Sequence, residues 1–180
     1  MTGYEDLCGA YFAREPHQLA IETIFRELPQ KMRQALSDHL AVPATPLILP
    51  SLTAAGRATS YVELCRYWLD QNGQRTWEIC PPDDYLLIDS DGICHFTIGV
   101  SLEQQPGAIA AASMIFLEFT IESVDEQSAD LRLIKPSHQI LIDLRNPDGY
   151  DDAATLVTTY LLEALRDRSP ARGLRGPLGY

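Results

Sequence analysis

Apolar residues in the first 40 positions recur with the 3.6-residue period of an α-helix. The first stripe, spaced i, i+3, i+4, i+7 and i+8, consists of Tyr4, Leu7, Cys8, Tyr11 and Phe12. Pro16 suits the first turn of a second helix, whose apolar face consists of Ile21, Ile24, Phe25 and Leu28. Pro29 restarts or kinks the pattern, because proline lacks a backbone donor, and apolar residues continue beyond it. The sequence therefore predicts consecutive N-terminal helices.

The next segment, 41–59, contains three prolines around the run Leu47–Leu49, which predicts either one brief strand or an extended linker. A capping box, Ser60 to Glu63, then predicts a helix from Ser60 to about Asp70. Its polar residues form one narrow line, and a helix this apolar is either buried on several sides or presents a surface to a partner. Its candidate partner-binding residues are Tyr61, Leu64, Tyr67 and Trp68.

From Arg75 the apolar period changes to two, which is typical of β-strands. After a first strand over 75–80, the chain reads as a β-hairpin, with strands at 85–88 and 93–100 around the turn Asp89–Gly92. Alternation places Cys94 on the opposite face from His95. Further alternating runs lie near 115–121, 131–133 and 140–144. Short strands joined by tight turns predict an antiparallel meander of about five or six strands.

A last amphipathic helix is predicted from about Asp151 to Asp167, with acidic residues in its first turn and Arg166 near its end, as the helix dipole favours. We expect one α+β domain over 1–168, in which 1–74 is mainly helical and 75–168 forms the sheet and the closing helix. The remaining segment, 169–180, is rich in Arg, Gly and Pro and is expected to be flexible when free.

Charge is unevenly distributed along the chain. The 180 residues carry 14 Lys and Arg against 25 Asp and Glu, a net charge of −11. Residues 81–130 contain ten acids and no Lys or Arg, which predicts an acidic face on the sheet for a basic protein partner. The alternative explanation is that these acids keep the protein soluble and protect the sheet edges from pairing with other chains. The candidate binding residues are Asp83, Asp84, Asp89, Asp91, Glu118, Glu122, Asp125, Glu126 and Asp130. Nucleic acid is not an expected partner, because this surface would repel phosphates.

No catalytic, metal-binding or cofactor-binding motif is present in the sequence. The four histidines are not at metal-ligand spacing with other ligands, and there is neither a nucleophile elbow nor a phosphate-binding glycine loop. A reactive Cys94 would need a base from elsewhere, such as His138. A cysteine among apolar strand residues is more often an inert core thiol. We therefore predict no catalytic residues, no metal and no cofactor.

The cysteines and the N-terminus bear on the compartment. Cys8, Cys65, Cys80 and Cys94 are widely spaced, which favours reduced thiols in a cytoplasmic protein. The N-terminus does not resemble a secretory signal, and no apolar window approaches the ~20 residues that span a bilayer. A cytoplasmic protein outside the membrane is the expectation.

Two stretches, 85–103 and 138–167, resemble type III secretion chaperones. The first reads YLLIDSDGICHFTIGVSLE, a strand, an acidic turn and a strand; the second is a strand, a turn and an amphipathic helix. The resemblance implies a small, acidic, non-enzymatic α+β protein that forms a cytosolic homodimer and binds a segment of a secreted effector. This chain differs in its additional N-terminal helical part and in having no obvious helix between the third and fourth strands, where that family forms much of its dimer interface.

Together these features favour a non-enzymatic, acidic protein-binding protein, such as a chaperone, adaptor or immunity-type inhibitor, that engages a basic protein partner. It would act as a homodimer or in a hetero-complex. Two alternatives remain open. One is a structural subunit of a larger bacterial assembly, and the other is a small enzyme with a Cys/His or carboxylate site.

Overall fold

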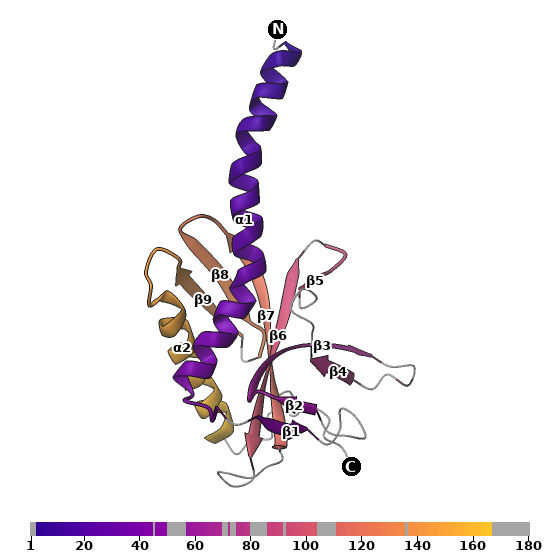
Figure 1. Cartoon of the computed structure of the whole chain (residues 1–180), viewed down its shortest axis with the longest axis vertical. Helices are drawn as coiled ribbons and strands as arrows, with labels where there is room; N and C mark the ends of the chain where they lie inside the picture. The colour runs from indigo at the N-terminus through magenta and orange to yellow at the C-terminus, as the bar shows by residue number, and fades with distance from the viewer. Residues whose placement is uncertain are drawn as a thin grey trace.

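The computed structural model describes residues 3–44, 46–49, 57–69, 72, 75–79, 86–91, 93–103, 111–135 and 137–166. An N-terminal helix precedes a seven-stranded antiparallel sheet and a C-terminal helix, which confirms the predicted α+β class (Figure 1). The elements are α1 (Tyr4–His39), β1 (Leu47–Leu49), β2 (Arg57–Thr59), β3 (Val62–Leu69), β4 (Arg75–Ile79), β5 (Leu87–Ile88), β6 (Cys94–Glu103), β7 (Ala111–Val124), β8 (Ser128–Leu133), β9 (His138–Asp143) and α2 (Gly149–Arg166).

The sheet has the strand order β4-β3-β6-β7-β8-β9, and the short β5 also pairs with β6. Strands β6 to β9 form the predicted meander, and the predicted hairpin is confirmed as β5 and β6, with Ile88 opposite Cys94. One edge of β6 pairs first with β5 and then with β3, while its other edge pairs with β7. Separately, β1 pairs with β2, so the predicted brief strand at Leu47–Leu49 is confirmed over the extended linker.

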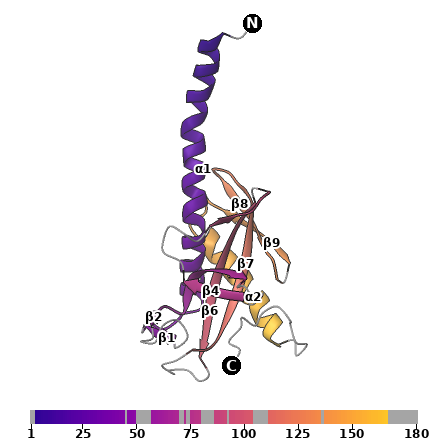
Figure 2. The ribbon, with the colours of Figure 1, turned by 90° about the vertical axis from the view of Figure 1, so that its right-hand side faces the viewer.

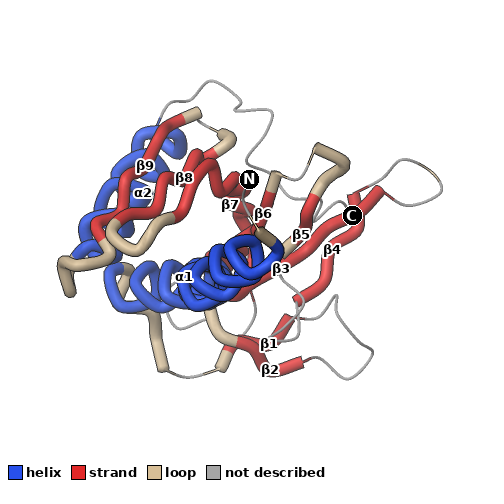
Figure 3. Tube along the Cα trace, turned by 90° about the horizontal axis from the view of Figure 1, so that it is seen from above, coloured by secondary structure: helices blue, strands red, loops and turns tan. Residues whose placement is uncertain are grey.

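Both helices pack on one face of the sheet, with α1 against α2 and β3, and α2 also against β9 (Figure 3). Alternate residues of β6, including Phe96 and Ile98, are buried on this face, and the Phe96 ring stacks on Phe119 of β7 with 4.8 Å between centroids. The helices contribute fully buried side chains to the same core, including Leu28, Met32, Leu36, Ala154 and Val157.

The segment predicted as consecutive N-terminal helices forms one continuous helix, so the predicted break is wrong. Helix α1 continues through both Pro16 and Pro29 for 36 residues. A proline inside a helix removes one backbone hydrogen bond, whereas a break would require a second costly nucleation. Around Pro29 the helix is also held by the buried side chains of Leu28 and Met32, which pack against the sheet. The first half of α1 projects well beyond the sheet (Figures 1 and 2).

The predicted helix from Ser60 to Asp70 is also wrong, because this segment forms strand β3. The glutamate half of the capping box exists: the Glu63 carboxylate accepts a hydrogen bond from the Ser60 backbone N–H at 2.9 Å, and the Ser60 hydroxyl donates to the same carboxylate at 2.6 Å. They stabilise the start of a strand that lies between β4 and β6. Val62 on one face and Cys65 on the other are both buried. A run that is apolar on both faces suits an interior strand as well as a buried helix.

Two further predicted elements are confirmed: the strand that begins at Arg75 is β4, and the last helix is α2. Cys80 and the tail 169–180 lie outside the described residues. The three described cysteines, Cys8, Cys65 and Cys94, are free thiols. Within the described residues, no helix combines the length and apolar character needed to cross a membrane.

Candidate functional site

Two acidic turns lie at the same end of the sheet. Strand β6 begins near the point where β7 ends, since Cys94 pairs with Ile121, so the β5–β6 turn and the β7–β8 turn lie at the same end of the sheet (Figure 1). We call the carboxylates of these two turns the acidic end. Its members are Asp89, Asp91, Asp125 and Glu126. The fold thus places four of the predicted acids at one end of the sheet.

Asp89 organises the first of these turns. Its Oδ1 accepts hydrogen bonds from the backbone N–H groups of Asp91 and Ile93, both at 2.9 Å. Its Oδ2 lies 2.9 Å from Nε2 of His95 in β6. The bond with His95 and the backbone N–H of Ile93 hold the pKa of Asp89 below its ordinary value. This carboxylate is therefore both fixed in position and ionised at neutral pH.

Asp125 has the same role in the second turn. Its Oδ1 accepts hydrogen bonds from the backbone N–H groups of Gln127 and Ser128, both at 2.7 Å, and these bonds lower its pKa.

Arg145, which follows β9 at the same end, hydrogen-bonds to Asp143 at 3.1 Å and to the Gln127 side chain at 3.2 Å. Its bond with Asp143 lowers the pKa of that carboxyl group as well.

The remaining predicted acids lie elsewhere. Glu118, Glu122 and Asp130 project from the sheet face opposite the helices, as the alternation in β7 and β8 requires. Glu122 forms an ion pair with Arg132 at 2.9 Å, and Asp130 accepts a hydrogen bond from the Gln139 side chain at 2.7 Å. Asp83 and Asp84 lie outside the described residues. The nine acids therefore do not form one continuous face among the residues that the structure describes.

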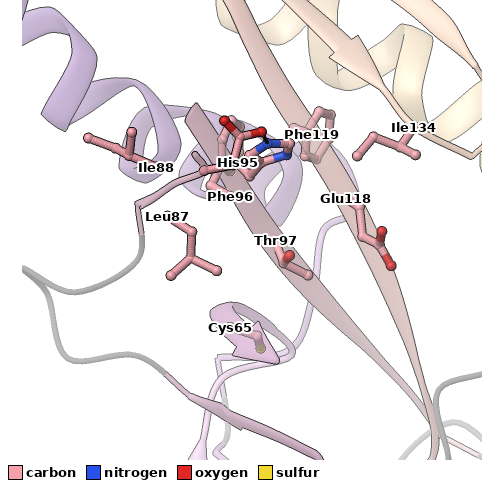
Figure 4. A pocket seen from close by; sticks show the side chains of 10 residues that line it. Cys65, Leu87, Ile88, His95, Phe96, Thr97, Glu118, Phe119 and Ile134 are labelled. Atoms are coloured by element: carbon pink, nitrogen blue, oxygen red, sulfur yellow. Dashed lines mark hydrogen bonds and ion pairs between the residues drawn. The ribbon is translucent and has the colours of Figure 1, made fainter. Parts of the chain in front are cut away.

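A cavity of about 240 Å³ opens on the sheet face away from the helices (Figure 4). Asp89, His95, Thr97 and Glu118 supply its polar groups, and Cys65 of β3 contributes a buried thiol to its wall. Apolar side chains from β5, β7 and the end of β8 complete the lining, among them Leu87, Ile88, Phe119 and Ile134. The cavity thus combines an apolar wall with two carboxylates and an oriented imidazole.

A second recess, of about 390 Å³, lies on the other side of the β5–β6 hairpin, between that hairpin and α1. The register explains the separation: Leu87 pairs with His95 on the cavity side, and Cys94, the partner of Ile88, lies on the helix side, while Ile88 itself lines both recesses. This recess, called here the hairpin groove, is lined by Gln18, Ile21, Glu22, Phe25, Arg26, Leu86, Ile88 and Cys94. This groove could not be predicted from the sequence, because α1 and β5 come close only in the folded chain.

The reactive-cysteine hypothesis is not supported by the geometry. Cys94 is buried, and burial together with the Asp89 charge raises the pKa of its thiol. His138, the suggested base, lies in β9, three strand steps of ~4.8 Å from β6, and stacks on Tyr160 of α2. The fold does not bring Cys94 and His138 together.

The four residues predicted on an apolar helix do not form a helical surface. Tyr61 and Leu64 are buried, and the Tyr61 hydroxyl donates a hydrogen bond to Glu103. Tyr67 and Trp68 belong to β3, and their side chains lie outside the described residues. In the described residues, no group of three or more His, Cys, Asp and Glu side chains is arranged to hold a metal ion.

Exposed apolar side chains are instead found on the projecting part of α1. The relative exposures are 81% for Tyr4, 63% for Leu7, 65% for Phe12 and 56% for Leu19. Part of this surface corresponds to the apolar stripe that the sequence shows at the N-terminus. Its exposure was not predicted, because the amphipathic pattern is also that of a helix packed along its whole length.

Comparison of the chain with protein families, with curated proteins and with solved structures gave no significant match.

Proposed function

We propose that this protein is a non-enzymatic binding protein that engages a protein partner with a basic surface. The observation that carries the proposal is the presence of two acidic turns at the same end of the sheet, in which Asp89 and Asp125 are each held by backbone N–H groups. Carboxylates fixed in this way need no rearrangement before they meet a cation, so less conformational entropy is lost on binding.

The electrostatics of the acidic end support a steering role. A surface with one sign of charge accelerates encounter with an oppositely charged partner, and it contributes less to the final affinity. The cavity beside Asp89 also suits a basic side chain, because Lys and Arg place an aliphatic stem on apolar surface and a charged head on carboxylates. A chaperone, an adaptor or an immunity-type inhibitor in the cytoplasm would use such a surface.

The test is co-purification of partners from the native host with the tagged full chain. Wild-type protein is compared with Asp91→Asn/Glu126→Gln, which removes two charges from the acidic end and leaves the Asp89 and Asp125 turn bonds intact. The matched control, Asp38→Asn/Glu163→Gln, removes two charges from α1 and α2. We expect the wild type to recover less partner as the salt concentration rises. At a given salt concentration, the first variant should recover less partner than the wild type, and the control variant should recover as much as the wild type. Equal recovery from all three proteins at every salt concentration would contradict the proposal.

The His95–Asp89 pair favours one second candidate, a small enzyme. A carboxylate that hydrogen-bonds to one imidazole nitrogen orients the ring and leaves the other nitrogen to act as a general base. A panel of activated esters and amides would detect such activity. If His95→Gln hydrolysed them as fast as the wild type, this candidate would be rejected.

A further inference from the structure

We propose that the hairpin groove and the projecting part of α1 together bind a basic amphipathic α-helix. This inference rests on the proposed function, because it specifies which element of the basic partner makes contact and where. The occupant has an apolar stripe on one face and Lys or Arg along the flanks of that stripe. The acidic end alone would accept any cationic surface; the groove adds a requirement for shape.

The projecting part of α1 exposes apolar side chains of the kind that protein interfaces bury. It extends past the sheet as a single helix (Figure 2). The side chains of Tyr4, Leu7, Phe12 and Leu19 on it are more than half exposed. Isolated helices gain little stability in water, and their apolar faces need a packing partner. Exposed apolar surface of this kind marks protein interaction sites. Packing by an incoming helix would stabilise this part of α1.

The groove continues this apolar surface down to the sheet. Ile21 and Phe25 of α1 face Ile88 of β5 and Cys94 of β6 across it. A neighbouring recess of about 450 Å³ shares Phe25 and Cys94 with the groove and adds Ile93, Thr120, Ile121 and Glu122. Ile88 and Ile93 are 69% and 42% exposed. An apolar path therefore runs from the foot of the projecting helix to the acidic end.

Charge around this path determines the chemistry of the occupant. Glu22 lines the groove, Asp91 lies in the turn that follows Ile88, and Glu5 and Asp6 lie in the first turn of α1. Glu122, in the neighbouring recess, is paired with Arg132, and Asp89 is paired with His95 on the cavity side of the hairpin. Arg26 is the one basic residue among the described side chains that line the two recesses. The remaining carboxylates thus still outnumber the basic groups along this path. Charge complementarity therefore favours an occupant that has an apolar stripe and positively charged residues on both sides of it.

Backbone hydrogen bonding favours a helical occupant over an extended one. A helix satisfies its own N–H and C=O groups, so it can lie in an apolar groove at no cost in unpaired backbone. An extended segment would need a strand edge for pairing, and in the part of this hairpin that the structure describes β5 offers only Leu87–Ile88. The wall opposite β5 is a helix, against which a second helix packs by fitting ridges into grooves.

The probe for the test is a synthetic 18-residue peptide of Leu and Lys, with Leu at i, i+3, i+4 and i+7 and a fluorescein label. A permuted peptide of the same composition, with strictly alternating Leu and Lys, is the peptide control. Fluorescence anisotropy at ~0.15 M salt, where the Debye length is ~8 Å, reports affinity for the full chain. The groove variant is Leu19→Ser/Ile88→Ser. Its control, Leu141→Ser/Leu162→Ser, also replaces two exposed apolar side chains, on β9 and α2.

We expect the helical peptide to bind the wild type at least tenfold more tightly than the groove variant, with less than a twofold change in the control variant. The permuted peptide should bind at least tenfold more weakly than the helical one. Equal affinity of the two peptides, or an unchanged affinity in the groove variant, would overturn the inference. Light scattering that showed a dimer of the wild type but not of the groove variant would overturn it too, because the occupant would then be a second copy.

The Asp91→Asn/Glu126→Gln variant separates this inference from the proposed function. Weaker peptide binding in this variant but not in the groove variant would leave the acidic end as the binding surface and refute the groove. Weaker binding in the groove variant alone would contradict the electrostatic part of the proposed function, and with it the basic character of the occupant. Weaker binding in both variants is the expected result.

Discussion

Asp89 and His95 join the two strands of the β5–β6 hairpin through a contact of 2.9 Å between Oδ2 and Nε2. The same carboxylate receives the backbone N–H groups of the turn between them. The hairpin separates the cavity on one sheet face from the hairpin groove on the other. One aspartate therefore holds the element that borders both recesses.

The first prediction concerns acid stability and Asp89→Asn. The pKa of Asp89 is lowered in the folded protein, so its ionised form contributes stability above the unfolded value, near 3.8, and loses it as pH falls through the folded value. Urea unfolding across this range should show a decline in the wild type that is smaller in Asp89→Asn. Asp91→Asn, which removes a charge from the same turn but keeps the Asp89 bonds, is the control. An identical decline in all three proteins would refute the role of Asp89.

The second prediction concerns close packing at Gly99 in β6. A Cβ atom at this position would lie 2.8 Å from Sδ of Met114 and 2.9 Å from Sγ of Cys65. Gly99→Ala should therefore destabilise the protein by about 1–3 kcal/mol, as overpacking of a core does. Urea unfolding measures the change. The double variant Gly99→Ala/Cys65→Ala should recover part of the loss, because it removes one of the two sulfur contacts; no recovery would point to another cause.

Gly149, at the start of α2, provides a third and more severe case. A Cβ atom there would lie 2.3 Å from the backbone oxygen of Asp143, which cannot move as a flexible side chain can. Gly149→Ala should cost about 3 kcal/mol, at or above the upper end of the usual range for overpacking. The same unfolding experiment tests this. A smaller loss than that of Gly99→Ala would contradict the expected order.

The fourth prediction concerns thiol reactivity. The raised pKa of Cys94 reduces its thiolate fraction near neutral pH, and burial restricts access to it. Cys8, on the projecting part of α1, is more accessible. Alkylation with iodoacetamide, followed by peptide mass spectrometry, should show Cys94 reacting at least tenfold more slowly than Cys8. Rapid labelling of Cys94 in the native protein would instead revive the hypothesis of a reactive cysteine.

The fifth prediction concerns Glu63 at the start of β3. Its Oε1 accepts hydrogen bonds from the Thr59 hydroxyl at 2.8 Å and from both the hydroxyl and the backbone N–H of Ser60. Glu63→Ala should cost about 1–3 kcal/mol in unfolding free energy, because these donors would lose their acceptor. Glu163→Ala, at an exposed site on α2, is the control and should have little effect. Equal effects of the two substitutions would refute this role.

The contrast between β6 and β3 shows what the sequence can and cannot predict. Strict alternation from Cys94 to Val100 has only one structural interpretation, and the predicted strand is confirmed. In β3 the local signal was real, since Glu63 contacts Ser60 as a capping box requires. The outcome was decided by neighbours far along the chain, because β3 fits between β4 and β6. A run apolar on both faces carries no periodicity to separate the two possibilities.

The candidate site was predictable only in part. The acidic turns were visible because Asp89 and Asp125 occur in short polar segments between strands. Their position at one end of the sheet follows from antiparallel pairing. The hairpin groove was not predictable, since it requires Phe25 of α1 to lie beside Ile88 of β5. Contacts of this kind arise from tertiary packing, which a local pattern does not specify.

Helix α1 is one element of secondary structure, but it spans two regimes of local stability. At ~1.5 Å per residue, its 36 residues extend about 54 Å, and its fully buried side chains begin at Leu28. We expect backbone amides beyond that point to open only with the sheet, and those before Leu19 to open by fraying from the N-terminal end of the helix. The boundary of the cooperative folding unit would then lie inside a continuous helix. A partner that packed on the first half would slow amide hydrogen exchange there and leave the exchange of the core unchanged.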